Sequence, residues 1–290
     1  MDLKQIMPLV LQVALVLMIG SVGLRAKWKD VINALVNVHG LLRAIVAVNV
    51  VVPLTAVLVC MVLPIPPAIK FGIVIMAVSP LAPVLPGKLL KAGMDASRVA
   101  GLYALLIGLA VVIVPVTITL LNRLFAQEVA TPVNSIAALV LISVMAPLAA
   151  GMILSSVAPT LAERLAGPAN LFGTLLLASV GLTIIATQAA DIEKLIGNGA
   201  VLAMAVTAAA GIVAGHLLGG PDSLGRKSLA LAAATRHPGI AAIIIKANFD
   251  DKRTLLSIIL FLLISVIVSH AYQLWLMGRD RRAARETRAA

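Results

Sequence analysis

Ser79-Pro80-Leu81-Ala82-Pro83-Val84-Leu85-Pro86-Gly87 interrupts an apolar run that begins at Phe71. Three prolines in this stretch remove three backbone donors and clash with the carbonyl groups before them, so no continuous helix passes through 79–87. A second interruption, Thr235-Arg236-His237-Pro238-Gly239, breaks another apolar run far along the chain. In lipid, unpaired backbone groups are tolerated only where protein or a water-filled cavity satisfies them. The two stretches therefore predict two discontinuous membrane helices.

The composition of the whole chain is that of an integral membrane protein. Of its 290 residues, 61% are hydrophobic and 12% are charged, whereas soluble domains carry about 25% charged residues. This composition excludes a soluble enzyme, a disordered scaffold and a disulfide-rich secreted domain. The single cysteine, Cys60, leaves neither a disulfide framework nor a cysteine metal site.

Apolar runs of membrane length divide the chain into spans. A helix needs about 20 apolar residues to cross the hydrocarbon core, and nine runs qualify. These are 6–24, 38–62, 67–93, 97–121, 133–156, 168–188, 199–219, 226–248 and 254–277. We expect an all-α integral membrane protein that forms one transmembrane domain over 1–290, with the lipid bilayer as its surroundings.

The places of the two interruptions predict an inverted repeat. Each interruption lies in the second-to-last span of its half, and one uninterrupted span follows it. Broken helices at equivalent places in two halves are typical of a midplane transport site. We therefore expect a first repeat over about 1–125, a second over about 130–278, and two discontinuous helices that cross near the bilayer centre. Since the first half has four spans and the second five, we expect that one peripheral helix is missing at the N-terminus.

The distribution of basic residues predicts the orientation. The net charge of +11 comes largely from short loops and the C-terminal tail, which is typical of membrane orientation rather than of nucleic-acid binding. With the N-terminus outside, thirteen lysines and arginines lie on the cytoplasmic face and six on the other. We expect a multi-pass protein of a cell membrane, the inner membrane, with a basic cytoplasmic tail over 279–290 and Arg43 as an interfacial anchor.

Positive groups surround both interruptions. Each break exposes the N-terminus of the following half-helix, whose free N–H groups and dipole attract anions. Lys88 and Arg236 add full charges, and His237 can titrate near neutral pH. All twelve carboxylates fall in predicted loops, tails or span ends. Positive groups that converge without an acid indicate a site for a carboxylate or similar oxyanion, whereas sodium or another metal needs several oxygen ligands.

These residues also have structural interpretations. Lys88 can extend to the cytoplasmic interface, and His237 can donate to a carbonyl group that the break leaves free. Arg236 lies about ten residues into its span, too deep to reach the interface, which favours a functional role. The predicted substrate-binding residues are taken from both breaks and from an amide in the second span. They are Ser79, Pro86, Gly87, Lys88, Thr235, Arg236, His237, Gly239 and Asn49.

Several stretches, together with the order of spans, resemble the bile acid:sodium symporter family. They are Ser79-Pro80, Lys91-Ala92-Gly93-Met94-Asp95, Arg236-His237-Pro238-Gly239-Ile240-Ala241, Ala247-Asn248-Phe249 and Gly23-Leu24-Arg25-Ala26-Lys27-Trp28-Lys29-Asp30. The resemblance covers nearly the whole chain in layout. It implies a ten-helix fold, here with nine helices, in which interleaved panel and core subdomains rock against each other. Two crossed, broken helices in the core give alternating access to an organic anion.

The chain departs from the family at the family's sodium ligands. A serine–asparagine pair after the first break aligns with Leu85 and Pro86, and a glutamate and a glutamine of the second crossover helix align with Ala232 and Arg236. The family's asparagine in that helix is replaced by His237. The resemblance thus implies a divergent member that lacks both sodium sites, and no metal site is predicted.

Three classes of function follow from these patterns. The first is a secondary transporter for a small organic anion that is independent of sodium, with His237 as the carrier of a coupled proton where one is used. The second keeps sodium symport, with Thr235, Asn49 and Ser79 supplying oxygen ligands. The third is a membrane receptor or a non-transporting subunit, which the absence of a soluble domain or long loop disfavours. We do not expect an enzyme or a cofactor, because no acid pair, metal-ligand cluster or nucleophile–base spacing is found in the spans.

Overall fold

The fold is built from α-helices joined by short connections. The computed structural model describes residues 3–82, 84–91, 93–125, 138 and 141–289, and these residues form helices and one isolated β-bridge. The helices are α1 (Leu3–Arg25), α2 (Trp28–Val36), α3 (Val38–Ile45), η1 (Val46–Val51), α4 (Val52–Val62), α5 (Pro67–Val78), α6 (Leu85–Lys91), α7 (Ala96–Phe125), η2 (Leu141–Met145), α9 (Ala146–Val157), α10 (Pro159–Glu193), α11 (Ala200–Leu218), α12 (Ser223–Ala234), α13 (Pro238–Asn248) and α14 (Lys252–Ala289). The expectation of an all-α membrane protein is confirmed for this part of the chain.

Six stretches of helix are long and apolar enough to cross a membrane. They are Ile6–Arg25, Val38–Val62, Arg98–Thr119, Pro159–Glu193, Ala200–Leu218 and Lys252–Arg279. Three shorter apolar helices, Pro67–Val78, Leu141–Val157 and Pro238–Asn248, correspond to the other three expected spans. The chain is therefore a multi-pass membrane protein. The number of nine spans stays a prediction, since most of the stretch 133–140, where the fifth expected span starts, lies outside the described residues.

Two helix boundaries differ from the sequence prediction. The span expected to start at 168 belongs to the 35-residue helix α10, which starts at Pro159 and continues through Pro168. A proline inside a membrane helix is tolerated because neighbouring groups can satisfy the freed carbonyl. The short amphipathic helix α2 lies in an expected loop, where Asp30 accepts a hydrogen bond of 3.1 Å from the backbone N–H of Lys27 at the start of the helix.

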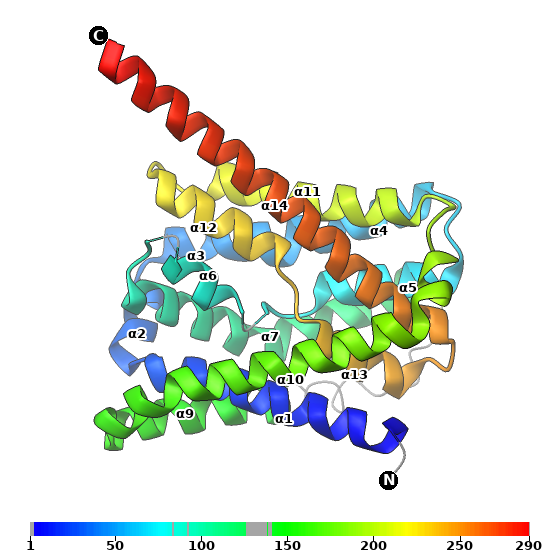
Figure 1. Ribbon diagram of the computed structural model, residues 1–290, viewed down its shortest axis with the longest axis horizontal. Helices are drawn as coiled ribbons and strands as arrows, with labels where there is room; N and C mark the ends of the chain where they lie inside the picture. The colour runs from blue at the N-terminus through cyan, green and yellow to red at the C-terminus, as the bar shows by residue number, and fades with distance from the viewer. Residues whose placement is uncertain (1–2, 83, 92, 126–137, 139–140, 290) are drawn as a thin grey trace.

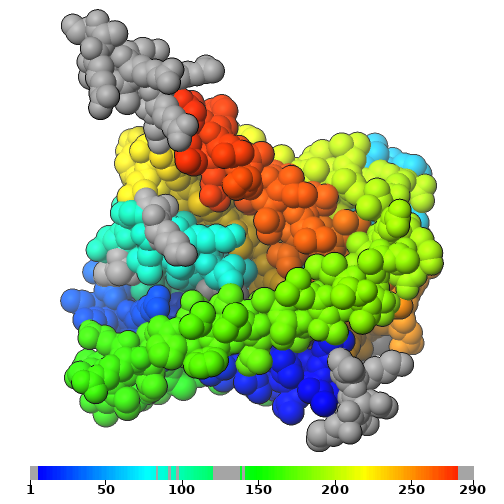
Figure 2. Space-filling model, in the orientation of Figure 1, coloured from blue at the N-terminus to red at the C-terminus, as the bar shows by residue number. Residues whose placement is uncertain are grey.

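Helices α1, α9 and α10 pack together along one edge of the molecule (Figure 1). We call these three helices the edge layer; Figure 2 shows α10 running across the whole width of the visible face. Glycines permit the close approach of α1 and α9, because a Cβ on Gly23 would overlap the carbonyl oxygen of Leu148 and one on Gly151 would overlap that of Gly20. Close backbone contact through small residues is how helices associate in a membrane, where burial in lipid gives no driving force.

The remaining helices form a second group, in which α11 packs against α4, α12 and α14, and α5 packs against α14. Two short π-helical segments, η1 and η2, occur in the described chain, and each ends just before a proline, Pro53 in α4 and Pro147 in α9. A proline has no N–H to donate and its ring crowds the preceding turn. The wider π turn relieves this crowding and leaves carbonyl oxygens available to other partners.

Candidate functional site

The two interrupted stretches meet in the interior of the protein. Helix α5 ends at Val78 and α12 ends at Ala234, and the residues after them are extended. Leu81 and Arg236 form an antiparallel β-bridge, in which the N–H of His237 donates to the carbonyl of Pro80 at 2.9 Å. These hydrogen bonds confirm that the two stretches lie side by side, as the sequence predicted. We refer to this pair of segments, 79–82 and 235–237, as the junction.

At the junction, backbone N–H and carbonyl groups that lie outside the helices find hydrogen-bond partners. Besides the bond from His237, the N–H of Ala82 donates to the carbonyl of Thr235 at 3.4 Å. The hydroxyl of Tyr103 on α7 donates to the carbonyl of Leu81 at 3.3 Å, and the Tyr103 side chain is almost completely buried. Because unpaired backbone groups are costly in a low-dielectric interior, this pairing is what permits two broken helices at that depth.

Arg236 ties three segments together at the junction. Its side chain is 2% exposed. The guanidinium donates one hydrogen bond to the carbonyl of Ser79 at 3.3 Å, at the end of α5, and another to the carbonyl of Val48 in the π-helical segment η1. Its Nε is buried and has no partner among the described residues. A full positive charge is thus held in the interior by backbone oxygens.

His237 lies at the start of α13 and is completely buried. Its Nδ1 accepts a hydrogen bond of 3.4 Å from the N–H of Ile240, which caps the helix. An Nδ1 that accepts leaves the proton on Nε2, and Nε2 is buried without a partner among the described residues. Gly239 follows two residues later, and a Cβ at this glycine would press on Leu15 of α1, so the start of α13 lies against the edge layer.

The hydroxyl groups at the junction are bound within their own helices. Ser79 donates to the carbonyl of Met76 at 2.8 Å, and Thr235 donates to the carbonyl of Leu231 at 2.6 Å. Both side chains are buried. Asn49 is half-buried in η1, next to the Val48 carbonyl that receives Arg236. Five of the predicted site residues, Ser79, Thr235, Arg236, His237 and Gly239, therefore lie at the junction or one to two residues beyond it.

Of the four other predicted residues, Asn49 lies in η1, and Pro86, Gly87 and Lys88 lie on α6. Pro86 and Gly87 line a small hollow of about 30 Å³ between the edge layer and α6 and α7, and Lys88 is exposed. Ser21 of α1 and Asn170 of α10 face the same hollow from the edge layer. The break in the first interrupted helix is thus close to the contact between the two helix groups.

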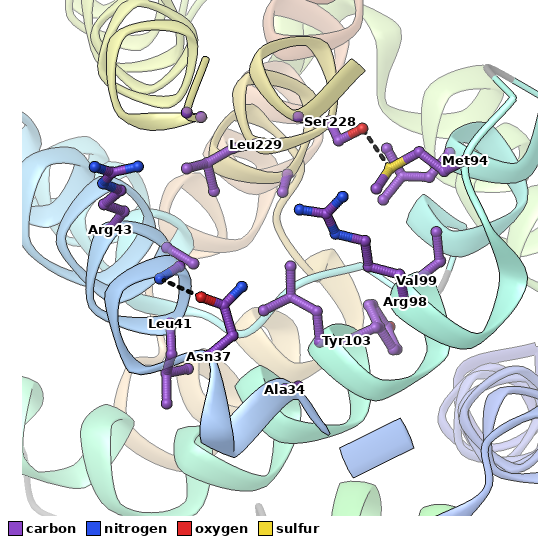
Figure 3. Close-up of a pocket in the computed structure, with 18 of the residues that line it drawn as sticks. Ala34, Asn37, Leu41, Arg43, Met94, Arg98, Val99, Tyr103, Ser228 and Leu229 are labelled. Atoms are coloured by element: carbon purple, nitrogen blue, oxygen red, sulfur yellow. Dashed lines mark hydrogen bonds between the residues drawn. The ribbon is translucent and has the colours of Figure 1, made fainter. Parts of the chain in front are cut away.

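A much larger cavity, of about 540 Å³, opens on the other side of the junction (Figure 3). Its walls come from α2, α3, α6, α7, α12 and the turn between α11 and α12. Leu81 of the first break and Ala232 of α12 belong to its lining, whereas none of the nine predicted site residues does. Three of the predicted residues, Pro86, Gly87 and Gly239, face the edge layer instead.

Two arginines that the sequence reasoning did not place in the site belong to this cavity. Arg43 of α3 and Arg98 of α7 both line it, and in Figure 3 the side chain of Arg98 extends into it while that of Arg43 lies at its edge. Arg43 was expected to be an interfacial anchor, and Arg98 was one of the thirteen basic residues expected on the cytoplasmic face. No local sequence signal pairs them, because they are brought together only by the packing of α2 and α3 against α7 and α12.

Comparison with known protein families gives a match over most of the chain. Residues 12–215 of the chain match the Sodium Bile acid symporter family. No curated protein matches the chain at a significant level.

Proposed function

Because the chain belongs to the Sodium Bile acid symporter family, a family of membrane transporters, we propose that it is a secondary transporter that moves a small organic anion by alternating access without sodium coupling. The observation that carries this proposal is the junction, where two broken helices pair through their backbones and Arg236 holds a positive charge between them. Broken helices at the midplane are the usual place for substrate and ion sites in secondary transporters.

Arg236 supports the absence of sodium coupling. Sodium needs several oxygen ligands, and backbone carbonyls at a helix break are the natural source of them. Here the carbonyl oxygens of Ser79 and Val48 accept hydrogen bonds from the guanidinium. A fixed cation in this position both occupies the oxygens and repels a second cation. The resemblance places sodium ligands of the family at Ala232 and Arg236, and neither residue can serve as an oxygen ligand through its side chain.

The positive ends of α6 and α13 support an anionic substrate. Both half-helices start at the breaks, and helix N-termini favour negative charge. Arg236 adds a buried positive charge behind them. In this proposal the anion binds between these half-helix starts and the edge layer, close to Pro86, Gly87, Lys88 and Gly239, once the two helix groups separate.

The arrangement of the helices supports alternating access. The edge layer of α1, α9 and α10 corresponds to the panel subdomain, and the remaining helices correspond to the core with the two crossed helices. The nine spans, the inverted repeats over about 1–125 and 130–278, and a cytoplasmic C-terminus in the inner membrane belong to the same proposal. His237 is the titratable group of the junction and the proposed proton carrier where transport is coupled to one; the added proton would bind at Nδ1, which here accepts from the N–H of Ile240.

Uptake by proteoliposomes tests the proposal. Purified protein would be reconstituted with sodium or with potassium as the only monovalent cation, and uptake of a labelled bile salt and of labelled short carboxylates would be measured. We expect uptake that is equal in the two salts and lost in Arg236→Gln. Arg164→Gln, which removes an exposed arginine from α10, is the matched control and should keep full uptake.

Two outcomes would contradict the proposal of sodium-independent anion transport. Uptake that requires sodium would favour the alternative of a sodium-coupled symporter, as the family description states for its members. Absence of uptake for every anion, in protein that melts cooperatively, would favour a non-transporting membrane receptor or subunit.

A further inference from the structure

We infer that Arg43 and Arg98 form a binding site for a dianionic organic acid with an apolar body, such as a medium-chain dicarboxylate. The site is the cavity of about 540 Å³, which is separate from the predicted residues at the junction. This volume lies within the range of about 300–1,000 Å³ that is usual for small-molecule sites. The statement that a transported substrate enters through this cavity rests on the proposed function. The statement that the cavity binds such an acid does not.

The two arginines come from opposite walls. Both arginines line the cavity; in Figure 3 Arg98 extends from α7 towards its middle, whereas Arg43 extends from α3 along its edge. Neither side chain makes a hydrogen bond or an ion pair with another of the described residues. Arg43 reaches towards the turn after α11, where its Nη1 would be 3.7 Å from a Cβ placed on Gly220. Two unpaired guanidinium groups in one cavity are suited to two acidic groups on a ligand.

Three aspartates also line the cavity, and each of them caps a helix. Asp30 accepts from the N–H of Lys27 at 3.1 Å at the start of α2, and Asp95 accepts from the N–H of Arg98 at 2.9 Å at the start of α7. Asp222 accepts from the N–H of Gly225 at the start of α12. A carboxylate in this position is stabilised by the positive end of its own helix. The positive helix ends partly offset the charge of the three carboxylates, and neither arginine is paired with one of them among the described residues.

The inner part of the cavity is apolar. Leu81, Leu85 and Leu229 line it, together with Tyr103, whose hydroxyl is bound to the Leu81 carbonyl. A ligand that reaches both arginines lays its middle part along these side chains, where burial of methylene groups favours binding. The amide nitrogen of Asn37 is a further donor on the wall formed by α3, because its oxygen already accepts from the N–H of Gly40 at 3.2 Å.

Calorimetric titration of the detergent-purified full chain tests this site. The probes are the dicarboxylates from succinate to sebacate and the monocarboxylates of equal length. We expect one dicarboxylate, such as adipate, to bind at least about tenfold more tightly than its matched monocarboxylate, hexanoate, since a second arginine–carboxylate contact contributes about a factor of ten or more. A maximum at one chain length is expected, because only an acid long enough to contact both arginines gains the second contact.

Single variants test whether Arg43 and Arg98 each bind one carboxylate of the acid. Arg43→Gln and Arg98→Gln should each reduce the affinity for adipate to that for hexanoate, and the double variant should bind neither acid. Arg98→Lys, which keeps the charge, should retain part of the preference. Arg164→Gln on the surface of α10 should leave all affinities unchanged, and a melting curve of each variant separates loss of binding from loss of fold.

The binding and transport measurements test this site separately from the proposed function. Equal affinity for the two acids in the wild-type chain, or a preference that survives in both Arg43→Gln and Arg98→Gln, would overturn this site. If those variants transport an anion as the wild type does and also bind adipate as it does, the site fails while the proposed function stands. If they lose adipate binding but the wild-type chain transports no anion, the site stands while the proposed function fails.

Discussion

The guanidinium of Arg236 donates a hydrogen bond of 3.3 Å to the carbonyl of Ser79, which lies 157 positions earlier in the chain. The second hydrogen bond of Arg236, to Val48 in η1, extends the link to a third segment. A single side chain thus holds together the ends of the two interrupted helices and a neighbouring π turn.

Arg236→Met should destabilise the protein strongly. The substitution keeps an apolar stem of similar length but removes the donors of two buried carbonyl groups, and unsatisfied buried acceptors cost about 1–3 kcal/mol each. We expect a loss of roughly 2–5 kcal/mol and a lower melting temperature in detergent. Arg164→Met, at an exposed position on α10, should change stability by less than about 0.5 kcal/mol. Equal melting of the two variants would show that Arg236 does not hold the junction.

Tyr103→Phe tests the support of the junction from α7. The hydroxyl of Tyr103 is the donor to the buried carbonyl of Leu81, so its removal leaves that carbonyl without the tyrosine and should cost about 1–3 kcal/mol. Thermal unfolding in detergent measures the change. Ser179→Ala removes an exposed hydroxyl from α10 and should be nearly neutral; a Tyr103→Phe protein as stable as this control would contradict the role of the tyrosine.

Gly23→Ala should separate α1 from α9. The new Cβ would overlap the carbonyl oxygen of Leu148, and backbone cannot move aside as a flexible side chain can. We expect a loss of about 1–3 kcal/mol, as in other overpacked interiors. Gly181→Ala on α10 makes the same change where a Cβ meets nothing within 4 Å, and there the gain in helix propensity of up to about 1 kcal/mol should dominate. Thermal unfolding of the pair gives opposite signs if the helix contact is as described.

His237→Asn separates capping from proton transfer. Asparagine can cap α13 through its side-chain oxygen, as His237 does through Nδ1, but it cannot titrate. We therefore expect a folded variant whose anion uptake no longer responds to an imposed pH gradient, while the wild type does respond. Uptake by proteoliposomes with acidic and neutral exteriors measures this. A pH response that persists in the variant would remove His237 as the proton carrier.

Much of the fold follows from the sequence, because its determinants are local. Pro80 follows the end of α5, and Pro86 and Pro238 stand in the first turns of α6 and α13, where the missing N–H of a proline costs no hydrogen bond. Runs of apolar residues predict membrane helices by their length alone. The expected meeting of the two interruptions was also correct, since in lipid each needs backbone partners and the other interruption is a ready source of them.

Other features depend on which segments pack together. The sequence indicated that Arg236 was too deep to reach water, but not that its partners would be the carbonyls of Ser79 and Val48, because any backbone oxygen is an equivalent acceptor until the chain is folded. Arg43 and Arg98 carry no mark of a shared cavity, since they are 55 positions apart on separate helices. Proline geometry and hydropathy are properties of the chain itself, whereas the partner of a charge is a property of three-dimensional packing, and only the tertiary structure decides it.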